Sequence, residues 1–171
     1  MELRFVAPDL RAIDDNPAEV IVCAMWEDER PMRGLAGLLD WRLSGRMSRL
    51  ARSRFMEGKL GEVLCLQGRP RLPFDKVLLV GAGPRAAFDE AAYRTAAGAV
   101  LKTLEGLKVP RAVVELPGRA GEAITPERAA EILLDASRDA AAHDAWFLVE
   151  TPEAQAKITA RGREERRRVR A

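Results

Sequence analysis

The stretch that decides the fold runs from residue 77 to 107 and has the sequence VLLVGAGPRAAFDEAAYRTAAGAVLKTLEGL. It begins with a short apolar run, which is typical of a strand covered on both faces. A glycine turn follows, and then a helical pattern in which apolar residues recur every three or four positions from Phe88 to Leu107. A strand, a tight turn and a helix in this order form the basic unit of an α/β fold.

Other segments repeat the strand pattern, since they are short, rich in branched or aromatic apolar residues and bounded by turn signals. The six predicted strands span residues 2–6, 19–25, 62–66, 76–80, 111–116 and 145–150. Further helices are predicted over 34–54, over 126–136 behind the N-cap Thr125, and after Pro152. We therefore expect a single three-layer α/β/α domain over 1–160, with a mixed, mostly parallel sheet of about six strands, and a basic tail over 161–171.

The glycine turn itself allows two interpretations. Gly81, Gly83 and Ala86 match the G-x-G-x-x-G/A spacing that brings a backbone close to a dinucleotide pyrophosphate. That fingerprint expects an acidic residue about 20 residues further on, but Glu115, at the end of the next predicted strand, lies 34 residues after Gly81. Asp89 and Glu90 also place negative charge in the first helical turn, where they would repel a phosphate. The preferred interpretation is a structural turn.

The alternative is a ligand-binding module. In that case the turn formed by Gly81, Ala82, Gly83, Pro84 and Arg85 receives a phosphate of ADP-ribose or another nucleotide, and Arg85 supplies positive charge.

Charge is unevenly distributed along the chain. Residues 161–171 hold six Arg and two Glu, so they contribute +4 to a net charge of +2. A second basic stretch spans 33–59. Aromatic residues that would stack on bases are absent from 161–171 and limited to Trp41 and Phe55 in 33–59, so nucleic acid is not the expected partner. Trp26 or Trp41 could anchor a protein contact. The predicted interaction surface comprises Trp41, Arg42, Arg46, Arg49, Arg166, Arg167 and Arg168.

The histidine and cysteine residues of the sequence do not indicate a catalytic or metal site. His143 is the only histidine and has no cysteine pair beside it, so it is predicted to cap a helix or lie on the surface. Cys23 and Cys65 lie in apolar runs, which predicts buried thiols. Neither a leader peptide nor a membrane-spanning stretch is recognised, which favours the cytoplasm. No catalytic residue, metal or cofactor is predicted.

Four phrases occur in an order that resembles the N-terminal domain of the leucine (cytosol) aminopeptidase family. They are EVIVCAM, GLAGLLDWRLSGRMSRLARS, FMEGKLGEVLCLQG and KVLLVGAG, and the similarity covers residues 1–118 well and the remainder loosely. The resemblance implies a macrodomain-like fold. It also implies homo-oligomers in which this domain lies at the periphery.

The resemblance places peptidase chemistry in a separate C-terminal domain. That domain binds two divalent metals around an N-T-D-A-E-G-R type motif, which this sequence lacks, so no catalytic residue is transferred. Macrodomains proper bind ADP-ribose through a glycine-rich loop, whereas WEDERPMRG follows the second strand here. We therefore expect a stand-alone, non-catalytic domain whose partner is a protein, a second copy or a separate catalytic subunit.

Overall fold

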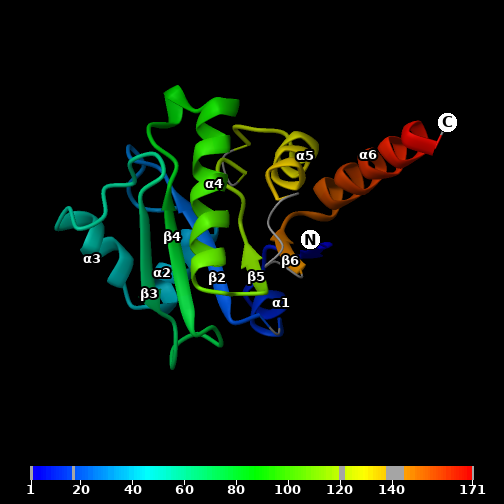
Figure 1. Cartoon of the computed structure of the whole chain (residues 1–171). Helices are drawn as coiled ribbons and strands as arrows, with labels where there is room; N and C mark the ends of the chain where they lie inside the picture. The colour runs from blue at the N-terminus through cyan, green and yellow to red at the C-terminus, as the bar shows by residue number, and fades with distance from the viewer. Residues whose placement is uncertain (1, 17, 120–121, 138–144, 171) are drawn as a thin grey trace.

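Six strands form one sheet in the computed structural model, which describes residues 2–16, 18–119, 122–137 and 145–170 (Figure 1). The order across the sheet is β1-β6-β5-β2-β4-β3. All neighbouring pairs are parallel except β3 with β4. The predicted mixed, mostly parallel sheet is therefore confirmed. The strands are β1 (Glu2–Val6), β2 (Val20–Met25), β3 (Val63–Gln67), β4 (Lys76–Gly81), β5 (Arg111–Val114) and β6 (Ala145–Val149).

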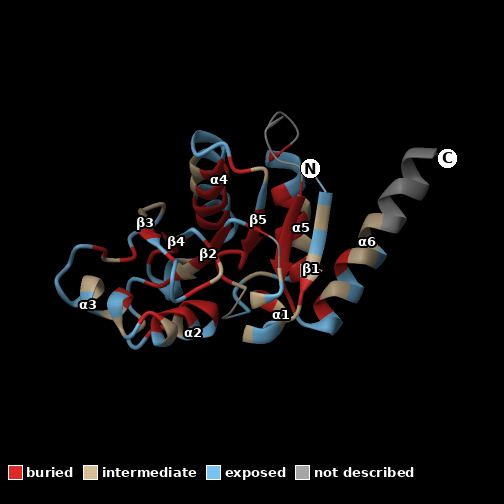
Figure 2. Cartoon of the chain, turned by 90° about the horizontal axis from the view of Figure 1, so that it is seen from below, coloured by how far each residue is buried: buried red, intermediate tan, exposed pale blue. Residues whose placement is uncertain are grey.

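Helices cover both faces of the sheet, as the apolar strands require. One face packs against the first three helices through Ile13, Leu39 and Met47, and the other packs against α4 and α5 through Tyr93 and Ile132. Figure 2 shows the central strands and the inward faces of these helices buried. The helices are α1 (Leu10–Asp14), α2 (Gly34–Arg42), α3 (Arg46–Arg52), α4 (Glu90–Gly106), α5 (Pro126–Ala136) and α6 (Pro152–Arg170), with the short 3₁₀ turn η1 (Arg85–Ala87).

On one face of the sheet, α5 begins at Pro126 as predicted, and α4 begins at Glu90, two residues after the predicted Phe88. Asp89 caps α4 by accepting a hydrogen bond from the backbone N–H of Ala92 at 2.8 Å, and Thr125 caps α5. The buried Tyr93 hydroxyl donates to the carbonyl oxygen of Ala129 at 2.7 Å and so joins α4 to α5. These contacts join α4 and α5, the two helices that cover this face of the sheet.

The predicted helix over 34–54 is wrong as a single element, because it breaks into α2 and α3. Ser44 and Gly45 between them adopt left-handed conformations, with φ of 55° and 74°. The Asp40 carboxylate accepts a hydrogen bond from the backbone N–H of Ser48 at 3.0 Å and thereby satisfies a free donor at the start of α3. The apolar spacing continues across the break, which is why periodicity alone concealed it.

Two cysteines that look alike in the sequence differ in the structure. Cys23 is buried in the central strand β2, as predicted, whereas Cys65 is exposed and its predicted burial is wrong. The cause is that β3 is the edge strand and alternates between a buried and an open face. The short helix α1 was not predicted, and His143 lies outside the described residues.

The last helix runs across the expected boundary at residue 160 into the basic tail. Helix α6 spans Pro152–Arg170, packs against α5 and buries Ala154 and Ile158 (Figure 1). No helix in the described ranges combines the length and apolar character that a bilayer crossing demands.

Candidate functional site

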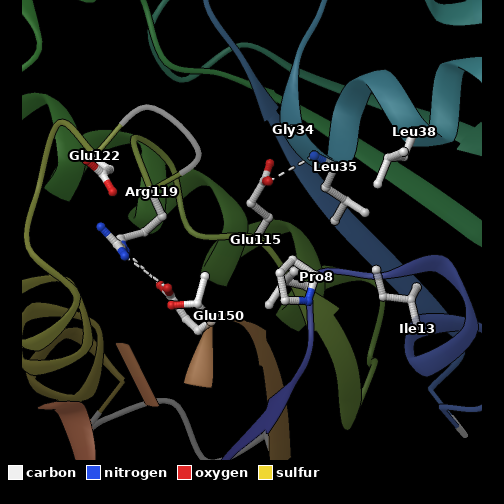
Figure 3. A pocket seen from close by; sticks show the side chains of 11 residues that line it. Pro8, Ile13, Gly34, Leu35, Leu38, Glu115, Arg119, Glu122 and Glu150 are labelled. Carbon is white, nitrogen blue, oxygen red and sulfur yellow. Dashed lines mark hydrogen bonds and ion pairs between the residues drawn. The ribbon is translucent and has the colours of Figure 1, made fainter. Parts of the chain in front are cut away.

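A cavity lies where three neighbouring parallel strands end. Pro8, Glu150 and Glu115 follow β1, β6 and β5, which are adjacent in the sheet. In open α/β sheets the carboxyl ends of the strands are the usual place for a ligand. The cavity there has a volume of about 490 Å³ (Figure 3). Its lining is formed by Pro8, Ile13, Gly34, Leu35, Leu38, Glu115, Arg119, Glu122, Val149, Glu150 and Thr151.

Glu115 is one of two buried carboxyl groups of this cavity, with Glu150, and is only 6% exposed. Its Oε1 accepts a hydrogen bond of 3.0 Å from the backbone N–H of Leu35, at the start of α2 (Figure 3). Burial raises the pKa of Glu115 from 4.5 to about 7, and the nearby Glu150 also raises it, while backbone hydrogen bonds from Leu35 and Ala24 act in the opposite direction. Glu115 can therefore gain or lose a proton near neutral pH.

Arg119 and Glu150 form a bidentate ion pair on the other side of the cavity (Figure 3). The Nε–Oε1 and Nη2–Oε2 distances are 2.7 and 3.0 Å, and the two side chains are 11% and 4% exposed. The remaining terminal nitrogen, Nη1, donates to the carbonyl oxygen of Ile124 at 2.7 Å. The charge of Arg119 is thus balanced within the protein, which leaves Glu115 and the exposed Glu122 as the uncompensated acids of the lining.

Most of the remaining wall is apolar, because Ile13, Leu35, Leu38 and Val149 contribute hydrocarbon surface, while Thr151 adds a hydroxyl group. Within the described residues, no group of three or more His, Cys, Asp or Glu side chains is arranged to hold a metal ion. The cavity therefore offers a compact apolar space with acidic groups along one side.

The glycine turn lies elsewhere and contacts its own chain. A Cβ atom on Gly81 would stand 1.9 Å from the carbonyl oxygen of Lys59, so only glycine fits there. Gly83 has a φ of 75°, a second reason for glycine. The predicted structural role of both glycines agrees with these contacts.

The backbone donors of this turn are already engaged. The N–H groups of Gly81, Ala82 and Gly83 donate to the carbonyl oxygens of Glu62, Met25 and Gly58 at 2.8–2.9 Å. Pro84 has no N–H, and the N–H of Arg85 lies 3.1 Å from a carboxylate oxygen of Asp28. The Arg85 guanidinium also approaches Glu29 at 3.4 Å. The turn contributes nothing to the cavity, and nucleotide binding at Gly81–Arg85 stays a prediction.

The predicted interaction surface is only partly brought together. Trp41 is 72% exposed on α2, whereas Trp26 is buried and packs edge-on against Phe88, so the alternative of Trp26 as an anchor is wrong. Arg42 pairs with Asp14 of α1. Arg46 and Arg49 line a second cavity of about 250 Å³ together with Arg69 and Arg71. Arg166, Arg167 and Arg168 belong to α6, and their side chains lie outside the described part of the structure.

Sequence reasoning missed Arg119 and Glu150 and considered Glu115 only as a ribose ligand. A usable signal was present, because VVE and FLVE each place one carboxylate directly after a buried strand. This signal does not say which strands are neighbours in the sheet. Glu115 and Glu150 come together because β5 and β6 are neighbours.

A family model and several relatives of known sequence match this chain. The model of the cytosol aminopeptidase family, N-terminal domain, matches residues 20–142. A cytosol aminopeptidase of Pseudomonas aeruginosa is 33% identical over 110 residues, covering 64% of this chain and 22% of the relative. A probable cytosol aminopeptidase of Halorhodospira halophila is 35% identical over 113 residues, with the same coverage. The chain thus spans about a fifth of the length of these relatives.

Solved structures share the fold at low sequence identity. An Oceanobacillus iheyensis macrodomain mutant has a TM-score of 0.73 at 14% identity, covering 97% of this chain and 93% of that one. A tomato leucine aminopeptidase mutant has a TM-score of 0.65 at 17% identity, covering 95% and 35%. A Trypanosoma brucei macrodomain in complex with ADP-ribose has a TM-score of 0.69 at 18% identity, covering 91% and 66%. The fold is macrodomain-like, and the chain belongs to the cytosol aminopeptidase family, of which it represents the N-terminal domain.

Proposed function

We propose that this domain is a non-catalytic contact domain that works by binding another protein through the outer face of α2. The observation that carries the proposal is the exposure of Trp41, which is 72% open to solvent on a described helix. Leu38, one helical turn earlier, is 36% exposed. Tryptophan is enriched among the residues that dominate binding energy at interfaces, so the open Trp41 beside the open Leu38 is the proposed anchor.

The helix that carries Trp41 is held firmly on both sides. Arg42 binds Asp14 of α1, and Asp40 accepts a hydrogen bond from Ser48 of α3. A side chain on a rigid helix loses little conformational entropy when a partner covers it. Arg46 and Arg49 follow α2 in the chain and line a basic cavity, so we propose a partner that offers an apolar pocket for Trp41 and acidic groups nearby.

The partner we propose is the catalytic part of a cytosol aminopeptidase. In the curated relatives the matching segment is only 22% of the protein, so the homologous domain is there joined to a much longer remainder. The motif N-T-D-A-E-G-R is absent from this sequence, which supports a non-catalytic role for the domain itself. The relatives are named as cytosol enzymes, and we propose the cytoplasm as the compartment.

Exchange of Trp41 tests this function. We expect the domain to bind the separately produced catalytic part of the Pseudomonas aeruginosa relative, and Trp41→Ala to weaken the complex at least about tenfold, as loss of a central aromatic anchor does. Calorimetry supplies the affinity, and light scattering after size exclusion distinguishes this complex from a dimer of the domain.

Leu134→Ala is the matched control, since Leu134 is 39% exposed on α5, away from α2. Equal losses for the Trp41 and Leu134 variants would contradict the proposed surface. A domain that remains monomeric and binds no catalytic part would overturn the contact function. Cleavage of leucine 4-nitroanilide by the pure domain would overturn its non-catalytic character.

A further inference from the structure

The cavity at the strand ends leads to an inference that does not depend on the contact function. We propose that it binds a small organic cation, namely a primary ammonium group on a compact apolar body. The ammonium donates hydrogen bonds to Glu115, and the apolar body packs against Leu35, Leu38 and Val149 (Figure 3).

The charge of the lining supports a cation. Three of its side chains are carboxyl groups, namely Glu115, Glu122 and Glu150, and only Arg119 is basic. Arg119 has its Nε and Nη2 on Glu150 and its Nη1 on a carbonyl oxygen. The lining therefore has an excess of negative charge once Glu115 is ionised, and an incoming anion meets an arginine that already has its partners.

The start of α2 leads to the same conclusion. Backbone N–H groups at a helix N-terminus are the usual binding groups for a phosphate. Here the Glu115 carboxylate already accepts the N–H of Leu35 at 3.0 Å, so an acid of the protein stands where an anionic ligand would be held. The site thus has the opposite polarity to a phosphate site, although solved macrodomains of this fold include one in complex with ADP-ribose.

Burial makes the carboxylate effective. Glu115 is 6% exposed, and a charge pair gains strength where water is excluded. With a pKa of about 7, Glu115 must ionise to pair with an ammonium, so binding releases a proton at or below neutral pH. The groups that face it are the backbone N–H of Leu35 and Ala24, the thiol of Cys23, and the side chains of Arg119, Glu122 and Glu150.

The test uses three probes of one shape, which are cyclohexylmethylamine, cyclohexylmethanol and cyclohexaneacetate. Calorimetry on the full chain is expected to detect binding of the amine, with an affinity about tenfold higher at pH 8 than at pH 6 because Glu115 ionises over this range. Repeating the titration at pH 6.5 in two buffers of different ionisation enthalpy measures the released proton. The alcohol and the carboxylate are expected to bind at least about tenfold more weakly.

Variants assign the binding to the cavity. Glu115→Gln keeps an acceptor for the Leu35 N–H, and is expected to weaken amine binding at pH 8 at least about tenfold and to remove its pH dependence. Leu38→Trp, which narrows the cavity without changing its charge, is expected to weaken binding as well. Glu105→Gln, on the exposed side of α4, is the matched control and should leave binding unchanged.

Several results would overturn the site. They are an amine affinity that is equal at pH 6 and pH 8, an unchanged affinity in both Glu115→Gln and Leu38→Trp, and the absence of amine binding at millimolar concentration. Tighter binding of cyclohexaneacetate than of the amine would also overturn it, since this would show that the cavity prefers anions. Leu38 lines the cavity and also lies beside Trp41, so Leu38→Trp changes both surfaces. The probe, pH and Glu115→Gln results concern the cavity alone, and they decide this proposal separately from the Trp41 contact.

Discussion

Glu115→Gln is expected to stabilise the folded domain by roughly 3 kcal/mol at pH 8, although it replaces a charged group by a neutral one. Burial raises the pKa of Glu115 from 4.5 to about 7, so ionising it in the folded state costs more than in the unfolded chain. Glutamine occupies nearly the same volume and can still accept the hydrogen bond from the Leu35 N–H. The substitution therefore removes the free-energy cost of ionising a buried carboxyl group and retains the hydrogen bond from Leu35.

The sign of the pH dependence follows from the raised pKa. Between pH 4.5 and about 7 the folded state holds the Glu115 proton more tightly than the unfolded state does, so the stability of the wild type falls as pH rises through this window. The advantage of Glu115→Gln should be near zero at pH 4, grow across the window and level off above pH 7. Urea unfolding of both proteins at a series of pH values measures it.

Glu105→Gln serves again as control. The free energy of unfolding of this variant should differ little from that of the wild type at every pH of the series. A constant difference between the wild type and Glu115→Gln at all pH values would contradict the raised pKa. If Glu115→Gln is less stable than the wild type at pH 8, the carboxylate is needed for the structure in its charged form.

The second large effect is expected at the glycine turn, where Gly81→Ala should destabilise the domain by about 3 kcal/mol or more. The added Cβ would stand 1.9 Å from the Lys59 carbonyl oxygen and 2.7 Å from the Gly58 carbonyl carbon, both of them backbone atoms that no rotamer change can move. The hydrogen bonds that join β4 to the 58–62 segment would have to separate. Thermal and urea unfolding measure the loss.

Gly98→Ala provides the matched control for this substitution. Gly98 lies within α4, and a Cβ there meets nothing within 4 Å. Alanine in place of a helical glycine should stabilise the domain by about 0.5–1 kcal/mol. Equal changes at Gly81 and Gly98 would show that the turn is not closely packed. If ADP-ribose stabilises the wild type and this effect is lost in Gly83→Val, the turn is a ligand site after all.

The strands and the two long helices could be predicted because their signals are local. Buried strands such as β4 and β6 are nearly continuous apolar runs, and α4 and α5 have both a periodic apolar stripe and a capping residue. The break between α2 and α3 could not be predicted in this way, because it depends on the contact of Asp40 with Ser48 and on left-handed backbone at Ser44 and Gly45. The exposure of Cys65 depends on β3 being at the edge of the sheet.

The candidate sites also combine features that the sequence predicted with features that only the structure decided. Trp41 could be named from the sequence as an anchor, but its exposure, and the burial of Trp26, are set by which helix face turns toward the sheet. The cavity acids were visible as single charges after apolar runs. Their convergence was not, since Glu115 and Glu150 are 35 residues apart and meet only because β5 and β6 are neighbours.

The sequence by itself determined the elements of this protein, the glycines required by its turn and its likeness to the N-terminal domain of the cytosol aminopeptidase family, because short-range sterics, periodic hydrophobicity and local motifs encode them. Only the tertiary structure decided that the strand order β1-β6-β5 gathers Glu115, Glu150 and Arg119 around one cavity. The physical reason is that strand adjacency and burial are properties of the whole packed sheet. The pKa of Glu115 and the polarity of the cavity follow from that packing.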